Sequence, residues 1–142
     1  MKQTRRQIFT SILITVAMFA SAVALSAAPL FEDSFEEAKQ KAKAENKPLI
    51  VIFSATWCPP CQIMKRAVYP SPEVEPFHDQ FVWAYLDADQ SENQTLMMKY
   101  GVQGIPHIAL HNSNGLITTQ LRGAMGPDQF ALELSKAISP SE

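Results

Sequence analysis

Long apolar runs alternate with amphipathic segments along the chain, and this pattern predicts both strands and helices. Residues 49–53 are apolar without interruption, which is typical of a strand buried on both faces of a sheet. Residues 81–86 predict a second strand, and residues 107–111 predict a third, which a turn at 112–115 connects to a hairpin partner at 116–121. Amphipathic or capped stretches predict helices at residues 35–47, 59–68, 71–77, 92–100 and 126–138.

This order of elements, α-β-α-α-β-α-β-β-α, predicts an α/β fold in which helices sandwich one central mixed β-sheet. The connection between the first two strands is long enough for a parallel crossover, and the hairpin adds an antiparallel edge. Ser34 and Glu37 have the spacing of a capping box at the start of the first helix. We expect the last helix to bury Phe130, Leu134 and Ile138.

The N-terminus has the pattern of an export signal. Lys2, Arg5 and Arg6 precede an uncharged apolar or small-residue run, residues 8–25, and small residues follow it. We therefore predict a signal peptide at residues 1–26, a single domain at residues 27–142 and a periplasmic location. The alternatives are that the apolar run stays uncleaved as a membrane anchor, or that the arginine pair directs export by the twin-arginine route.

The charge balance argues against a nucleic-acid partner. The predicted signal holds three of the 12 Lys and Arg residues, so the remaining chain carries nine against 14 Asp and Glu, a net charge of about −5. The sequence shows no basic stripe of the kind that binds phosphate backbones.

Cys58 and Cys61 are the only cysteines, and they form a CxxC motif directly after the first long strand. A zinc site needs four ligands, and no histidine lies at a finger-like spacing from the pair. A disulfide across so short a loop constrains the unfolded chain little, so redox chemistry explains the motif better than stability does. At a helix N-terminus Cys58 would be the exposed nucleophile, and Cys61, one turn later, would resolve the mixed disulfide.

Pro59 and Pro60 separate the cysteines and modulate this chemistry. Prolines fit the first turn of a helix, but they carry no amide hydrogen. The amides of Cys61 and Gln62 are then the main backbone donors for a Cys58 thiolate. We therefore expect a moderate lowering of the Cys58 thiol pKa.

With motif and element order together, residues 33–138 resemble the thioredoxin-fold family. The resemblance depends on Trp57-Cys58-Pro59-Pro60-Cys61, on residues 99–106 ending in Ile105-Pro106, and on the closing hairpin and helix. It implies that Pro106 follows a cis bond and lies against the disulfide. It also implies that the backbone at Ile105 pairs with an extended substrate, and that Trp57 shields the sulfurs and contacts substrate.

Residues 68–74 and 122–125 are most similar to a narrower group. This group comprises the C-terminal periplasmic domain of bacterial thiol:disulfide interchange proteins and small stand-alone exported relatives. The likeness implies a thiol:disulfide oxidoreductase without an organic cofactor or metal, and it favours reduction of the substrate over its oxidation. The implied partners are exported proteins with thiols or disulfides, together with a membrane or periplasmic redox partner.

The chain departs from the family pattern at three positions that matter for the chemistry. The family's buried acid, six residues before the first cysteine, is Ile52, and its lysine partner on the neighbouring strand aligns with Tyr85. That acid is thought to move a proton to or from the second thiol. The residue after the proline at 106, commonly threonine, is His107.

His107 leaves three interpretations open. Protonated, it would stabilise the Cys58 thiolate; neutral, it would join Cys58 and Cys61 in holding a soft ion such as Cu(I); or it simply faces solvent. The second interpretation makes the protein a copper carrier, the main alternative to an enzyme. A further alternative is a redox-inert module that binds extended peptides beside Pro106. We expect His78 and His111 to be surface residues.

Overall fold

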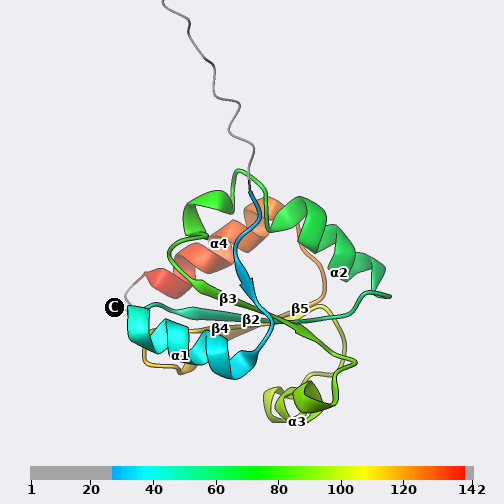
Figure 1. Ribbon diagram of the computed structural model, residues 1–142. Coiled ribbons are helices and arrows are strands. Elements are labelled where there is room, and N and C mark those ends of the chain that lie inside the picture. Colours follow the sequence, from blue (N-terminus) through cyan, green and yellow to red (C-terminus); the bar gives the residue numbers. More distant parts are fainter. Residues whose placement is uncertain (1–26, 140–142) are drawn as a thin grey trace, which may run out of the picture.

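A five-stranded mixed sheet lies at the centre of the computed structural model, which describes residues 27–139 (Figure 1). The strand order is β1-β3-β2-β4-β5. The strands are β1 (Phe31–Glu32), β2 (Leu49–Ser54), β3 (Val82–Asp87), β4 (His107–His111) and β5 (Ile117–Arg122). The helical segments are α1 (Phe35–Glu45), α2 (Pro59–Ile63), a π-helical turn η1 (Met64–Val68), a 3₁₀ turn η2 (Glu75–Phe77), α3 (Ser91–Tyr100) and α4 (Pro127–Ile138).

Strand β2 forms the middle of the sheet and is buried along its whole length. It pairs in parallel with β3 and antiparallel with β4, and β5 extends the sheet as the hairpin partner of β4. A strand with helices on both faces has no solvent side, which explains its unbroken apolar run. The predicted α/β class and mixed sheet are therefore confirmed.

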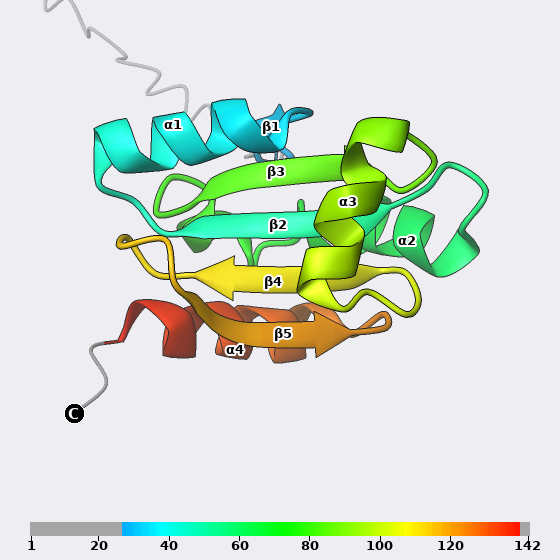
Figure 2. The ribbon, with the colours of Figure 1, turned by 90° about the horizontal axis from the view of Figure 1, so that it is seen from below.

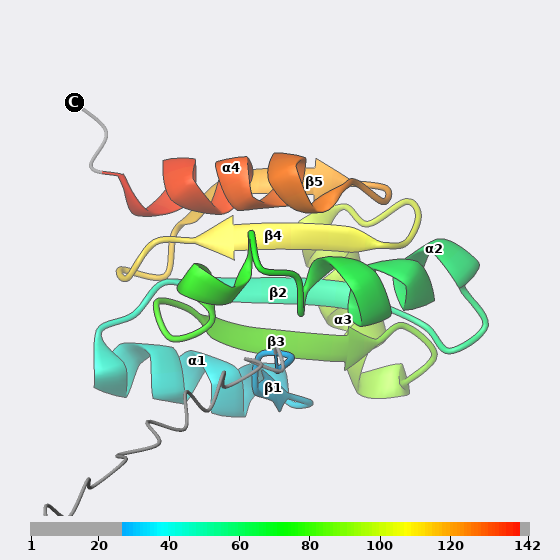
Figure 3. The ribbon, with the colours of Figure 1, turned by 90° about the horizontal axis from the view of Figure 1, so that it is seen from above.

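Helices cover the two faces of the sheet in pairs. Figure 2 shows α1 and α3 on one face, and Figure 3 shows α2 and α4 on the other. The α2/α4 face encloses one apolar core, which includes Ile50, Ile52, Met64, Trp83, Ile108, Phe130 and Leu134. The α1/α3 face encloses a second, which includes Ala38, Ala42, Val51, Phe53, Ala84, Leu86 and Tyr100. Successive strand residues alternate between these two cores.

The structure differs from the sequence prediction in a few elements. Strand β1, which the sequence did not predict, pairs in parallel with β3 through Phe31 and Glu32. The helix predicted at 59–68 is present, but its second half widens into a π turn, with the amide of Tyr69 bonded to the carbonyl of Met64 at 2.9 Å. Ile138, predicted to be buried, is 36% exposed because it lies at the last residue of α4.

The predicted N-terminal signal lies outside the described residues, as do residues 140–142. Between residues 27 and 139, no helix has both the length and the apolar character needed to cross a bilayer.

Candidate functional site

The Cys58–Cys61 disulfide lies where β2 passes into α2. Cys58 is the N-cap of α2, and the amide of Cys61 donates to its Sγ atom at 3.3 Å. The amide of Gln62 donates instead to the carbonyl of Cys58, at 3.1 Å. Because Pro59 and Pro60 lack amide hydrogens, the Cys61 amide is the backbone donor that the first turn of α2 directs at this sulfur.

Both sulfurs are covered by their neighbours, and the prediction that Cys58 is exposed is wrong for this oxidised form. Cys58 is 3% exposed and Cys61 1%, and both pack with Ala55 and Ile105. Cys58 Sγ lies 3.8 Å from the carbonyl oxygen of Ile105, and the Ile105–Pro106 peptide bond is cis. The loop before β4 therefore forms the wall opposite α2, and it covers the disulfide from that side.

Trp57 stands beside the disulfide with 64% of its surface exposed. Its indole Nε1 donates to Oδ2 of Asp89 at 2.7 Å, which holds the ring across the loop between β3 and α3. A large apolar ring kept in solvent beside two sulfurs is available to a partner molecule. Asp89 was not predicted as a site residue. It follows the end of β3, which runs parallel to β2, so both strands lead to the same edge of the sheet, and this position is the sequence signal that indicates it.

Ile52 and Tyr85 are neighbours in the parallel register of β2 and β3, as the sequence alignment predicted. The hydroxyl of Tyr85 lies 2.6 Å from the hydroxyl of Ser54, which is 1% exposed. From η1, Lys65 Nζ lies 4.4 Å from the centroid of the Tyr85 ring. Two hydroxyls and an ammonium thus lie near the position where the family has a buried acid and a lysine.

A pocket of about 220 Å³ opens at this point. Its walls come from β2 and β3 and the loops that follow them, from α2 and η1, and from the residue before the N-cap of α1. They are Asp33, Ser54, Ala55, Thr56, Gln62, Lys65, Tyr85, Asp87 and Gln90. Ala55 also packs against both cysteines, and Gln62 Nε2 donates to the Ala55 carbonyl at 2.9 Å. One residue therefore separates the pocket from the disulfide. Ser54 and Lys65 were not predicted as site residues, although Ser54 shares a strand face with Ile52.

His107 is buried, and none of the three interpretations of it from sequence describes its position. It is 1% exposed, it pairs with Phe53 in the sheet register, and the two rings are 6.1 Å apart. Phe53 belongs to the core under α1 and α3, whereas α2 covers the opposite face. His107 Nε2 contacts Gln120 Oε1 at 2.7 Å. The sheet thus directs this side chain away from the α2 face.

The copper interpretation fails on the same geometry. Within residues 27–139, no three His, Cys, Asp or Glu side chains are grouped closely enough to hold a metal ion, so His107 does not join the cysteines. Pairing with Phe53 is the physical reason, because neighbours in an antiparallel register point to the same side of the sheet.

His111 is also buried, at 4% exposure, so its predicted surface position is wrong. Its Nδ1 donates to the carbonyl of Leu49 at 3.2 Å, and its Nε2 lies 2.8 Å from the hydroxyl of Tyr100. Burial lowers the pKa of His111, and burial raises the pKa of Tyr100 to about 12. His78 is half-buried, with Nε2 2.7 Å from the carbonyl of Tyr69.

A family model described as thioredoxin-like matches residues 31–113, more than half of the chain. The chain belongs to the thioredoxin-like family. Strands β1 to β4, the disulfide at the start of α2 and the proline before β4 all lie within this match, and β5 follows it. The chain is thus a thioredoxin-like oxidoreductase family member with a CxxC disulfide.

Curated thioredoxin-like relatives include small and large proteins. Thioredoxin-like protein slr1139 from Synechocystis sp. is 30% identical over 107 residues, which cover 75% of this chain and 93% of the relative. The thiol:disulfide interchange protein DsbD from Neisseria meningitidis is 30% identical over 115 residues, 80% of this chain but 18% of DsbD. A protein disulfide-isomerase from Zea mays is 29% identical over 77% of this chain and 21% of its own length. The chain therefore spans about a fifth of the two larger relatives.

Solved structures of similar fold also include relatives of DsbD and of disulfide isomerases. The reduced C-terminal domain of N. meningitidis DsbD superimposes with a TM-score of 0.65 at 28% identity, covering 76% of this chain and 99% of that domain. A disulphide-isomerase-like protein from Bacteroides thetaiotaomicron gives a TM-score of 0.69 at 28% identity, covering 84% of this chain and all of its own. The resemblance to the DsbD C-terminal domain and to stand-alone relatives is confirmed.

Proposed function

We propose that the protein is an exported thiol:disulfide oxidoreductase that exchanges electrons with protein substrates through Cys58 and Cys61, with reduction of the substrate favoured over its oxidation. The observation that carries this proposal is the position of Cys58 as the N-cap of α2, with one amide directed at its sulfur and the Ile105 loop opposite. Partial positive charge at a helix N-terminus favours a thiolate there.

The exchange proceeds in two steps, and in each step one sulfur–sulfur bond forms as another breaks. In the reduced protein the Cys58 thiolate attacks one sulfur of a substrate disulfide, which forms a mixed disulfide and releases one substrate thiolate. Cys61 then loses its proton and attacks Cys58, which re-forms the Cys58–Cys61 bond and releases the second substrate thiolate. Two electrons pass to the substrate, and the two released thiolates take up protons from water.

The chain offers substrate contacts around this bond. The exposed indole of Trp57 supplies apolar area, and the carbonyl of Ile105, beside Pro106, lies close to the sulfur that reacts. An extended substrate backbone pairing with Ile105 would present its own disulfide to Cys58. Pro59 and Pro60 separate the two cysteines, and Pro60 limits the donors to the thiolate because it carries no amide hydrogen.

The export pattern at residues 1–26 and the likeness to the DsbD domain support thiol:disulfide exchange with exported proteins in the periplasm. A membrane or periplasmic redox protein would then reduce the Cys58–Cys61 disulfide after each cycle. The reductase direction rests on the likeness to DsbD, a thiol:disulfide interchange protein.

Turbidimetric reduction of insulin by dithiothreitol tests the proposal. The wild-type protein should accelerate precipitation of the insulin B chain, and Cys58→Ser should return the rate to that of dithiothreitol alone. Equal rates with the wild-type and the Cys58→Ser protein would contradict it. Titration against glutathione redox buffers then gives the reduction potential, in which about 30 mV corresponds to a tenfold change in the equilibrium.

A further inference from the structure

Lys65 lines the pocket behind the disulfide, next to the positions at which the family pattern has a buried acid and its lysine partner. Ile52 and Tyr85 occupy the positions of the family's buried acid and lysine, so no carboxylate stands at residue 52 to take the proton of Cys61. The nearest polar groups on that strand pair are the hydroxyls of Ser54 and Tyr85, 2.6 Å apart. Neither hydroxyl is a base at neutral pH.

Lys65 belongs to the same helical segment as Cys61 and follows it by four residues. Residues four apart on a helix lie on neighbouring turns, and Lys65 stands where α2 passes into the π turn η1. The ammonium group stands 4.4 Å from the centre of the Tyr85 ring, which is the negative face of the aromatic system. This contact, together with the Tyr85–Ser54 hydrogen bond, holds the charge over the pocket although Lys65 itself is exposed.

We propose that Lys65 is a positioning residue, which stabilises the Cys61 thiolate electrostatically from the wall of this pocket. The inference rests on the proposed exchange reaction. In it the proton of Cys61 leaves to bulk water, and the thiolate so formed attacks Cys58.

Other charged groups face the same pocket. Asp33, before α1, and Asp87, at the end of β3, both line it and oppose the effect of the lysine. The carboxylate of Asp87 already accepts a hydrogen bond from the amide of Asp89 at 2.9 Å, which engages part of its charge locally. Lys65 alone among these charges lies on the helix that carries Cys61.

The test measures the pKa of Cys61 directly. In the Cys58→Ser protein Cys61 is the only thiol, because the chain has two cysteines. Absorbance at 240 nm and the rate of alkylation with iodoacetamide, both followed against pH, report its thiolate. Adding Lys65→Met should raise the Cys61 pKa by about half a unit, a modest shift because the ammonium is exposed to solvent and salt. At neutral pH this corresponds to roughly a threefold fall in the alkylation rate.

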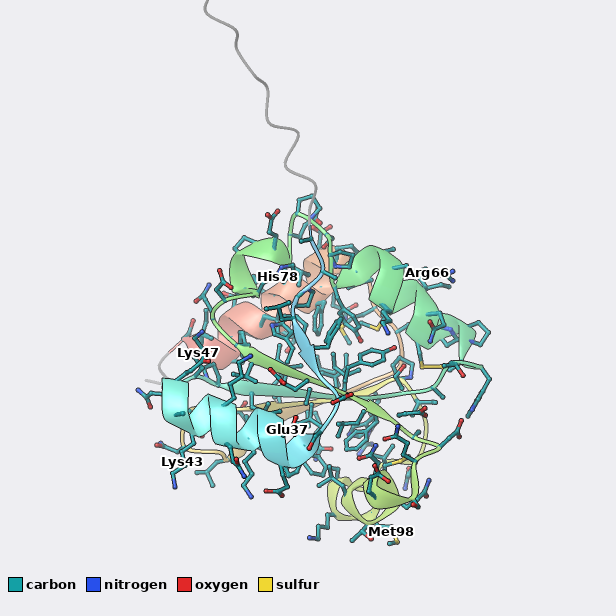
Figure 4. The ribbon with its side chains drawn as sticks, in the orientation of Figure 1. Glu37, Lys43, Lys47, Arg66, His78 and Met98 are labelled. Carbon is teal, nitrogen blue, oxygen red and sulfur yellow. A yellow bond between two sulfur atoms is a disulfide. The ribbon has the colours of Figure 1, made fainter. Side chains whose placement is uncertain are left out.

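Two matched controls decide the outcome. Lys65→Arg keeps the charge and should leave the Cys61 pKa unchanged. Arg66→Met removes a charge from the next residue, which points away from the sheet in Figure 4 and does not line the pocket, and should also leave it unchanged. The Lys65→Met shift should shrink when the salt concentration rises.

No shift with Lys65→Met, or an equal shift with Arg66→Met, would overturn the inference. Insulin reduction by the protein with both cysteines and Lys65 intact is measured in parallel. If that protein reduces insulin while Lys65→Met leaves the Cys61 pKa unchanged, only the role of Lys65 fails. If it does not reduce insulin, the proposed function fails.

Discussion

The amide of Cys61 donates to Sγ of Cys58 at 3.3 Å across a first helical turn in which both intervening residues are prolines. An N-cap side chain accepts hydrogen bonds from the second and third helical amides, and here Pro60 removes the second. The sulfur therefore has one backbone donor, the amide of Cys61, whereas a residue other than proline at position 60 would supply a second. The consequence is a Cys58 thiolate that is stabilised to a moderate degree.

Restoring the missing donor should make the thiol more acidic. We predict that Pro60→Ala lowers the Cys58 pKa in the reduced protein by about half a unit to one unit, because the thiolate gains a second amide. Pro59→Ala is the matched control, since the first helical amide does not reach the N-cap side chain in this geometry. Thiolate absorbance at 240 nm in a Cys61→Ala background measures both. A lower pKa with Pro59→Ala and none with Pro60→Ala would contradict the argument.

The hydrogen bond from Trp57 to Asp89 predicts a specific loss of protein substrate binding. Asp89→Ala frees the indole, and a mobile ring contributes less to a contact because it loses more conformational entropy on binding. We expect kcat/KM for insulin to fall about threefold to tenfold, while the reaction of Cys58 with a small disulfide such as oxidised glutathione is unchanged. Asp89→Asn, which keeps an acceptor oxygen, should retain most of the activity. Equal losses with both kinds of disulfide would contradict a role in holding the substrate contact.

The buried pair Tyr100 and His111 predicts that stability decreases in mild acid. Burial lowers the pKa of His111 in the folded state below its ordinary value of 6.5, so the unfolded chain binds its proton first. The stabilisation from neutral His111 is therefore complete above about pH 6.5 and is lost as the pH falls towards the folded-state pKa. The free energy of unfolding should fall by about 1.4 kcal/mol for each unit by which the two pKa values differ.

Urea denaturation between pH 7.5 and 5 measures this dependence. His111→Gln should flatten the acid-side decrease, because the titrating group is gone, whereas His78→Gln should leave it in place. A decrease that is the same size in the His111→Gln protein would show that other groups cause it.

Two side chains of α4 differ in burial, and we predict that shortening each to alanine lowers the free energy of unfolding by different amounts. Leu134 is fully buried in the core under α2 and α4, and Leu134→Ala should lower the free energy of unfolding by about 2–5 kcal/mol. Ile138 is 36% exposed at the helix end, and Ile138→Ala should lower the free energy of unfolding by less than about 1.5 kcal/mol. Equilibrium urea unfolding compares the two, and similar losses would contradict the observed packing.

Much of this fold could be predicted from the sequence because its strongest signals are local. The apolar run of β2, the hairpin turn after β4 and the two adjacent prolines of α2 each carry their structure in a few consecutive residues. Strand β1 could not be predicted, since a two-residue strand has no periodicity and exists because Phe31 and Glu32 pair with β3. The burial of His107 and His111 depends on strand register, which places each ring over the α1/α3 core rather than in solvent.

The same distinction explains what could be predicted of the site. Cys58 and Cys61 form a short motif, and the resemblance to the thioredoxin-fold family implied that Trp57 and the Ile105–Pro106 pair lie beside them. Asp89 and Lys65 come from other segments and reach the site through single side-chain contacts. Such contacts leave no periodic pattern, and they were missed.

Trapping of a mixed disulfide tests the central claim most directly. The reduced Cys61→Ala protein is incubated with a disulfide-containing substrate protein, quenched with acid and analysed by non-reducing electrophoresis and mass spectrometry. The account predicts a covalent adduct joined at Cys58, which dithiothreitol releases and which the wild-type protein does not accumulate because Cys61 resolves it. Absence of any adduct at Cys58, with the protein folded and its thiol free, would contradict the account.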